Sequence, residues 1–240
     1  MNTATYMDTN IMNTRADLSL ARLLRLASPA LPVGAFSYSQ GLEWAVESGG
    51  VTDALSAARW ISDAMRFAVA RSEAPCWLRM HAAWCANDTA KLNEWNAFFL
   101  ATREGGELRA ETNHMGRALR VMMVHSNEFP AALMAALAAI EEPSYPLVFA
   151  AAVSAWQIEP RPALTGYLWS WAENQVIAAM KLVPLGQADG QRILATLIEE
   201  MPAALDAIFA CEDDDIGTLA HGLAIASAQH ESQYTRLFRS

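Results

Sequence analysis

The chain has 240 residues, 53% of them hydrophobic, which is enough to bury a substantial core in one domain. A formal charge of −9 excludes surfaces built for the phosphates of nucleic acid or anionic lipid, because both would repel the chain, so we expect protein partners, no nucleic acid and no membrane. Three cysteines without a CxxC pair exclude a disulfide framework and indicate a reducing, cytoplasmic setting.

Apolar residues recur at helical spacing through almost the whole chain, and alternating strand-like runs are scarce. The pattern predicts an all-α fold, a single-domain helical bundle of about ten to twelve helices, with residues 1–16 disordered and the domain over residues 17–240. The expected helices span residues 17–27, 37–48, 53–71, 73–86, 88–104, 107–126, 130–141, 145–158, 162–182, 188–200, 202–211 and 217–230.

An apolar loop interrupts the helices early in the chain, in LASPALPVGAFSYSQGLEWAVE at 26–47. Pro32 fixes its own backbone angle and Gly34 permits a turn that a side chain would obstruct, so the loop is expected to be stiff. Ser37 and Gln40 have the spacing of a capping box, which predicts that a helix opens there. From residue chemistry alone the loop either covers the core or forms a rigid docking edge.

Catalytic signatures are missing from the sequence: it contains no GxxxxGK[ST], GxGxxG, HExxH or GxSxG motif, so we predict no catalytic residue, no cofactor and no enzyme activity. His81 and Cys85 lie four residues apart and share a helical face, which is a two-ligand fragment of a metal site. A buried thiol beside a partly buried imidazole is the other interpretation, and we predict no metal site.

Two later stretches are unusual for a scaffold interior. In KLVPLGQADGQ at 181–191, Lys181 ends an apolar helix, proline and glycine form a compact turn, and Asp189 is placed to cap the next helix. In SAQHESQYTRLFRS at 227–240, large apolar and cationic residues crowd a chain end that would normally fray. This tail is either folded back on the body or reserved for a partner.

These two stretches, the loop at 26–47 and ATREGGELRAE at 101–111 together resemble the UreF family of urease accessory proteins. The resemblance covers most of the chain and implies an all-α, non-enzymatic chaperone component that dimerises. It implies binding to the accessory protein UreD, also called UreH, and recruitment of the GTPase UreG, with modulation of that GTPase, so that nickel is loaded into the urease apoprotein. The alternative is a metallochaperone that itself carries nickel, with His81 and Cys85 or a histidine at a dimer interface as ligands.

The resemblance also implies three groups of partner-binding residues. The first is in the loop: Pro32, Gly34, Phe36, Ser37, Tyr38, Gln40, Gly41 and Glu43. The second faces the GTPase or shapes a passage for nickel: Lys181, Pro184, Gly186, Gln187 and Gln191. The third belongs to a tail at about 229–240 that orders against the UreD-type partner: His230, Glu231, Gln233, Tyr234, Arg236, Leu237 and Phe238.

The sequence departs from the family pattern at two adjacent positions. Where the family commonly reads RETREL, this chain has REGGEL at 103–108, so glycines replace a threonine and an arginine. Glycine lowers helix propensity by about 1 kcal/mol per residue, which predicts a break or bend at Gly105 and Gly106. Any partner contact of the missing arginine cannot be transferred to this chain.

Overall fold

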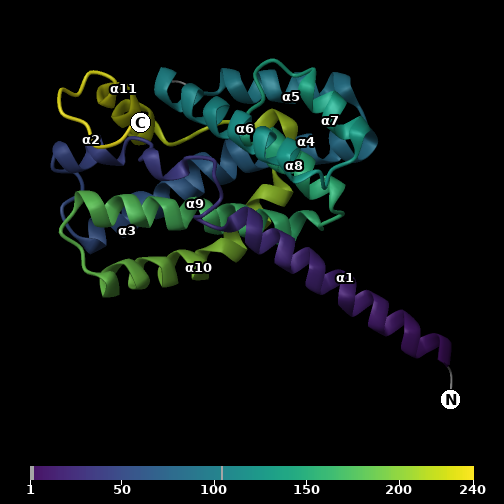
Figure 1. Ribbon diagram of the computed structural model, residues 1–240. Coiled ribbons are helices and arrows are strands. Elements are labelled where there is room, and N and C mark those ends of the chain that lie inside the picture. Colours follow the sequence, from purple (N-terminus) through teal and green to yellow (C-terminus); the bar gives the residue numbers. More distant parts are fainter. Residues whose placement is uncertain (1–2, 104) are drawn as a thin grey trace.

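A computed structural model describes residues 3–103 and 105–240, with side chains from residue 14 onward (Figure 1). Its helices confirm the all-α prediction, and the described residues contain no strand. The elements are α1 (Thr3–Ala27), η1 (Ala35–Ser37), α2 (Leu42–Glu47), α3 (Ala54–Ala64), η2 (Met65–Glu73), α4 (Ala74–Ala86), α5 (Thr89–Ala101), α6 (Gly106–Ser126), α7 (Ala131–Ala138), α8 (Tyr145–Ala155), α9 (Pro160–Leu182), α10 (Gln187–Ala210), η3 (Asp213–Asp215) and α11 (His221–His230). Within that described part, no helix has the length and apolar character needed to cross a bilayer.

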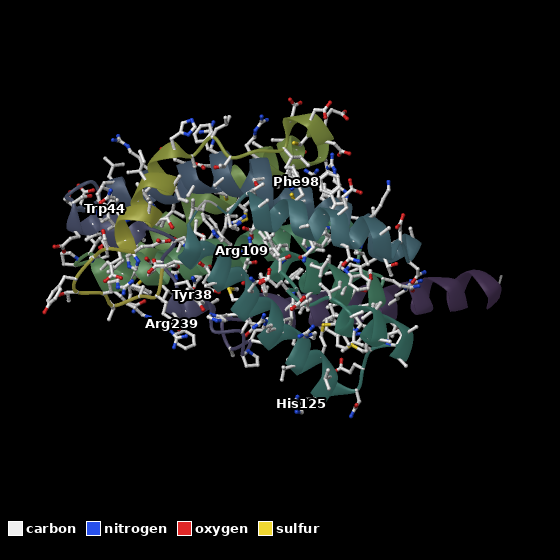
Figure 2. The ribbon with its side chains drawn as sticks, turned by 90° about the horizontal axis from the view of Figure 1, so that it is seen from above. Tyr38, Trp44, Phe98, Arg109, His125 and Arg239 are labelled. Atoms are coloured by element: carbon white, nitrogen blue, oxygen red, sulfur yellow. The ribbon has the colours of Figure 1, made fainter. Side chains whose placement is uncertain are left out.

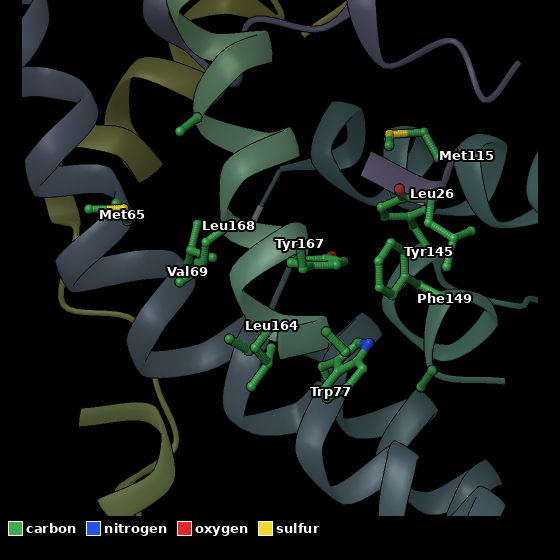
Figure 3. Packing of buried hydrophobic residues seen from close by; sticks show 14 of the residues in the cluster. Leu26, Met65, Val69, Trp77, Met115, Tyr145, Phe149, Leu164, Tyr167 and Leu168 are labelled. Carbon is green, nitrogen blue, oxygen red and sulfur yellow. The ribbon is translucent and has the colours of Figure 1, made fainter. Parts of the chain in front are cut away.

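Helix α8 forms the centre of the bundle, because every residue from Tyr145 to Val153 is buried. A helix that is apolar all round must be covered on all sides, and here α4 and α6 pack against it. Figure 3 shows the aromatic part of this core, in which the Phe149 ring meets Trp77 and Tyr167 edge to face, at centroid distances of 6.4 and 5.0 Å. Such edge-to-face contacts stabilise the packing of α4, α8 and α9 against one another.

A π-helical segment, η2, joins α3 to α4 without a break, where the sequence predicts two separate helices at 53–71 and 73–86. The wider turns leave backbone carbonyls that accept hydrogen bonds from outside the helix: Phe67 O from Leu219 N at 2.9 Å and Arg71 O from Gly217 N at 3.0 Å. The chain between η3 and α11 is therefore fixed along this segment, and the last helix starts at His221 instead of residue 217.

Two other helices are longer than expected. Helix α1 begins at Thr3, whereas the sequence analysis expects disorder up to residue 16; no glycine or proline interrupts Thr3–Ala27. Residues 1 and 2 of that expected segment lie outside the described residues. Helix α10 continues through Pro202, where two helices are predicted. Burial of Met201, Leu205 and Ile208 outweighs the cost of about 3 kcal/mol for a proline inside a helix.

Candidate functional site

The loop at 28–41 does not start a helix at Ser37, so the predicted capping box is wrong. Ser37 ends the short 3-10 turn η1, and α2 starts only at Leu42. Between them Gln40 and Gly41 have left-handed backbone angles, with φ of 53° and 80°. The side chain of Gln40 reaches other helices.

Gln40 links the loop to α6 and α9. Its Nε2 donates to Glu111 Oε1 at 2.7 Å, and its Oε1 accepts from Trp171 Nε1 at 2.8 Å. At Gly41, a Cβ atom would lie 3.0 Å from both the Cβ of Ala226 and the backbone nitrogen of Ser227. Glycine is required here both for the positive φ and for the close approach of α11.

The chain after α11 is fastened to the loop by the carboxylate of Glu43, which is buried at the start of α2. Its two oxygens accept from Leu237 N at 2.6 Å, from Phe238 N at 2.8 Å and from His230 Nε2 at 3.1 Å. Hydrogen bonds to an ionised acceptor are stronger than neutral ones. One acidic side chain of α2 thus binds three donors of the last eleven residues.

His230 is fully buried between two carboxylates from different helices. Its Nδ1 lies 2.6 Å from Glu107 Oε2 of α6, opposite the contact to Glu43. Arg236 Nη1 approaches the other oxygen of Glu107 at 2.6 Å. The ring of His230 therefore bridges the two carboxylates, one at each ring nitrogen. We call Glu43, His230, Glu107 and Arg236 the tail clasp.

The final residues fold back onto the body. Phe238 is buried, and Lys181 Nζ lies 5.4 Å from the centroid of its ring. Arg239 N donates to Ser37 O at 2.8 Å, and Ser39 N donates to Ser240 O at the same distance. Figure 2 shows Tyr38 and Arg239 close together, in agreement with the backbone hydrogen bond between Arg239 and Ser37. Of the two interpretations of the tail, folding back therefore holds for Phe238 and Ser240.

The structure brings half of the predicted partner-binding residues together, and we call their common surface the tail–loop face. Its members are Ser37, Tyr38, Gln40, Gly41, Glu43, Lys181, His230, Arg236, Leu237 and Phe238. Large apolar side chains remain exposed on or next to it: Phe36 at 64%, Leu237 at 65% and Tyr234 at 102% of full exposure. The buried members hold the face in shape, whereas these three are free for contact.

Other predicted residues lie outside these contacts. Pro32 is exposed on the loop and Gly34 has a φ of 78° there. Gln233 Nε2 donates to Thr235 O within the tail. Pro184, Gly186, Gln187 and Gln191 are exposed on the α9–α10 turn and the first turn of α10, which Figure 1 places at the same end of the molecule as the tail. Only Lys181 connects that segment to the tail, among the described contacts.

Sequence reasoning missed Glu107 and Glu111, the two carboxylates of α6 that reach the tail. Glu107 binds His230 and Arg236, and Glu111 Oε2 accepts from Ser240 Oγ at 3.0 Å. Their spacing of four residues places both on one helical face, which is a signal in the sequence. Nothing in the local pattern identifies their partners.

A cavity of about 40 Å³ lies behind the loop, large enough for about one to three water molecules. Arg103 Nη2 pairs with Glu73 Oε2 at 2.9 Å beside it, and the Tyr167 hydroxyl donates to Glu73. Burial raises the pKa of Glu111, on the cavity wall, to about 7. The cavity therefore has a polar lining but no room for a substrate of ordinary size.

The two glycines that depart from the family pattern have a packing role. The predicted break occurs, since α5 ends at Ala101 and α6 starts at Gly106. A Cβ atom on Gly105 would lie 2.8 Å from Ser227 Oγ of α11. The Glu107 amide donates to Glu231 Oε1 at 3.3 Å, so Glu231 satisfies a free amide at the start of α6. Gly105 lets the last helix approach this end of α6.

The His81 and Cys85 pair does not extend into a metal site within the described residues, where no group of three His, Cys, Asp or Glu side chains could hold an ion. Cys85 Sγ lies 3.8 Å from His81 Nε2. The imidazole stacks on Trp77 with ring centroids 5.1 Å apart, and burial lowers the pKa of His81. Burial also raises the pKa of the Cys85 thiol, which disfavours the thiolate form that binds metals.

Comparison with known proteins identifies relatives of the whole chain. A family model described as UreF matches residues 51–198. The chain is 50% identical over 225 residues to the urease accessory protein UreF of Azoarcus sp. (strain BH72), with 93% of this chain and 96% of that protein covered. It is also 50% identical over 224 residues to the protein of the same name from Dechloromonas aromatica (strain RCB), with 93% of this chain and 98% of that protein covered. The protein of the same name from Methylobacillus flagellatus is 46% identical over 222 residues, with 92% of this chain and 98% of that protein covered.

Proposed function

The chain belongs to the UreF family of urease accessory proteins, and we propose that it serves urease maturation as a scaffold that binds a UreD/UreH-type protein and recruits the UreG GTPase. In this proposal the chain forms a homodimer and modulates the GTPase, so that GTP hydrolysis and nickel release occur beside the urease apoprotein. The chain itself makes and breaks no covalent bond.

The observation that carries the proposal is the convergence of the loop, Lys181 and the tail on one face. Backbone hydrogen bonds from Ser39 and Arg239, the tail clasp and the Lys181–Phe238 contact fix these segments relative to one another. A preordered surface loses less conformational entropy when a partner docks than a flexible one. The exposed side chains of Phe36, Tyr234 and Leu237 supply the large apolar contacts that dominate protein interfaces.

We assign the tail–loop face to the UreD/UreH-type protein and the exposed residues from Pro184 to Gln191 to the GTPase. The first assignment is supported by the apolar side chains just named. The second is supported by exposure alone: Pro184, Gly186, Gln187 and Gln191 cover no neighbouring element among the described contacts. Both faces lie toward the same end of the molecule in Figure 1, which would place the two partners next to each other.

A double variant, Tyr234→Ala with Leu237→Ala, tests the first assignment. Both side chains are exposed, so the variant should unfold within about 0.5 kcal/mol of the wild type. Burying each against a partner is worth about 1.5–3 kcal/mol, so affinity for the UreD/UreH-type protein, measured by calorimetry, should fall at least ~100-fold. The matched control is Leu219→Ala, which removes a leucine that is also more than half exposed but lies on another loop. Wild-type affinity in the double variant would refute the assignment.

A further inference from the structure

We propose that a groove between the end of α1 and the C-terminal half of α6 binds an acidic amphipathic helix of a partner protein. The groove has a volume of about 640 Å³. The residues that matter are Arg25 of α1, Pro32 of the loop, and Arg117, Val121, Met122 and His125 of α6. The proposal does not depend on the partner assignments made above.

The charge of the groove is opposite to that of the chain. The protein has 26 acidic and 17 basic residues, yet none of the residues that line the groove is acidic. Arg117 is exposed, and its guanidinium has no protein partner among the described contacts. Arg25 of the groove is paired with Glu128, whose Oε1 lies 2.6 Å from Arg25 Nη1. A carboxylate entering the groove therefore meets an unpaired cation and no free acidic group of the wall.

The spacing of the side chains fits a helix. Arg117, Val121 and His125 follow one another at intervals of four residues, so they form a line along one face of α6, about 12 Å long at ~1.5 Å per residue. Val121 is 53% exposed at the middle of this line, and Val124 is 55% exposed beside it. A partner helix that places a carboxylate against Arg117 and an apolar residue one turn further, against Val121, matches this order.

The free ring nitrogen of His125, at one end of the line, faces away from α6. His125 Nδ1 lies 2.8 Å from Val121 O and can only donate to that carbonyl, which leaves Nε2 facing away from the helix. Figure 2 shows His125 at the outer edge of the molecule. At the other end, His114 lies one turn before Arg117 and contacts the Tyr38 hydroxyl through Nδ1 at 3.1 Å. Pro32 of the loop lines the groove, so the groove borders the loop of the tail–loop face.

An acidic protein helix fits the groove better than an anionic membrane or a nucleic acid does. Two arginines, one already neutralised by Glu128, give too little charge to hold a membrane surface or nucleic acid against a net charge of −9. The exposed valines, by contrast, gain only when an apolar surface covers them. One unpaired arginine next to exposed valines matches a partner segment that carries both acidic and apolar side chains.

The test uses the full chain and a fluorescein-labelled peptide of about 16 residues that places leucines on one helical face and glutamates beside them. Fluorescence anisotropy at about 50 mM and about 300 mM salt should show binding that weakens as salt rises. A peptide with lysine at every glutamate should not bind. Arg117→Glu should weaken binding at least ~10-fold, and Val121→Asp should do the same.

The matched control is Lys91→Glu, the same charge change at an exposed helical position on α5, which should leave binding unchanged. Circular dichroism of each variant confirms that it is folded. The proposal is overturned if the lysine peptide binds as tightly as the glutamate peptide, or if Arg117→Glu and Lys91→Glu have equal effects. It is also overturned if the chain ignores the peptide but binds vesicles of phosphatidylglycerol, or if the groove is closed by self-association that Val121→Asp abolishes.

Discussion

The substitution Glu43→Gln probes the tail clasp. The Glu43 carboxylate accepts hydrogen bonds from the amides of Leu237 and Phe238, at 2.6 and 2.8 Å, and from His230 Nε2 at 3.1 Å. A glutamine has nearly the same shape but offers one oxygen, and its NH₂ group would face an N–H donor. At least one of the three donors then loses its acceptor, and His230 loses one of its two anionic partners.

The size of the effect follows from these contacts. A hydrogen bond to a charged group contributes about 1.5–3 kcal/mol, and the loss of one together with weakening of the others should cost roughly 2–3 kcal/mol. Since about 1.4 kcal/mol corresponds to a factor of ten, opening of the tail becomes roughly 30- to 150-fold more frequent. The rest of the bundle does not depend on these bonds, so the change should be local.

Amide hydrogen exchange measures this opening directly at Leu237 and Phe238. In Glu43→Gln these two amides should exchange roughly 30- to 150-fold faster than in the wild type, while amides of the buried helix α8 keep their rates. The matched control is Glu47→Gln, at the exposed last residue of α2, which also carries Glu43. It should change the exchange rates of neither the tail amides nor the α8 amides. If the two tail amides exchange within about threefold of the wild-type rate, the clasp does not hold the tail.

The remaining predictions concern stability and metal binding. Phe238→Ala removes a buried side chain and should lower the free energy of unfolding by about 3–5 kcal/mol, whereas Leu237→Ala removes an exposed one and should leave it nearly unchanged. Urea denaturation of the two variants checks this. Equal losses would contradict the placement of Phe238 inside the fold and Leu237 on its surface. Burial raises the pKa of Glu111 from 4.5 to about 7, so the folded state binds its proton more tightly and stability falls as pH rises between those values. Glu111→Gln should therefore gain up to ~3 kcal/mol over the wild type at pH 8 and little at pH 4.5, and a gain that is the same at both pH values would show that ionisation is not its cause. Equilibrium dialysis of the isolated chain should find no tightly bound stoichiometric nickel; one nickel per chain would favour the metallochaperone alternative.

The helices were largely predictable from the sequence because their signals are local. Helix α6 is expected at residues 107–126 and spans Gly106–Ser126, since the glycines before it and the periodic apolar residues within it act over a few positions. Pro202 shows the limit of such signals. Its local preference predicts a helix end, but burial of the residues around it keeps α10 continuous.

The candidate site was predictable only in part. The resemblance identified the loop and the tail, but the bonds that join them connect residues far apart in the chain, such as Glu43 with His230 and Glu107 with Arg236. Polar pairing across the fold leaves no periodic trace in the sequence. The capping box failed for the same reason, because Gln40 is drawn into bonds with Glu111 and Trp171 that only the folded chain provides.

The most direct test of the scaffold proposal is the nickel content of urease produced from its operon with this chain wild type, absent, or carrying Tyr234→Ala with Leu237→Ala. Metal analysis of the purified urease should show nickel-replete enzyme only with the wild-type chain. The double variant should give nickel-poor urease although it is itself folded and present at normal levels. Nickel-replete urease in the absence of the chain would contradict the account.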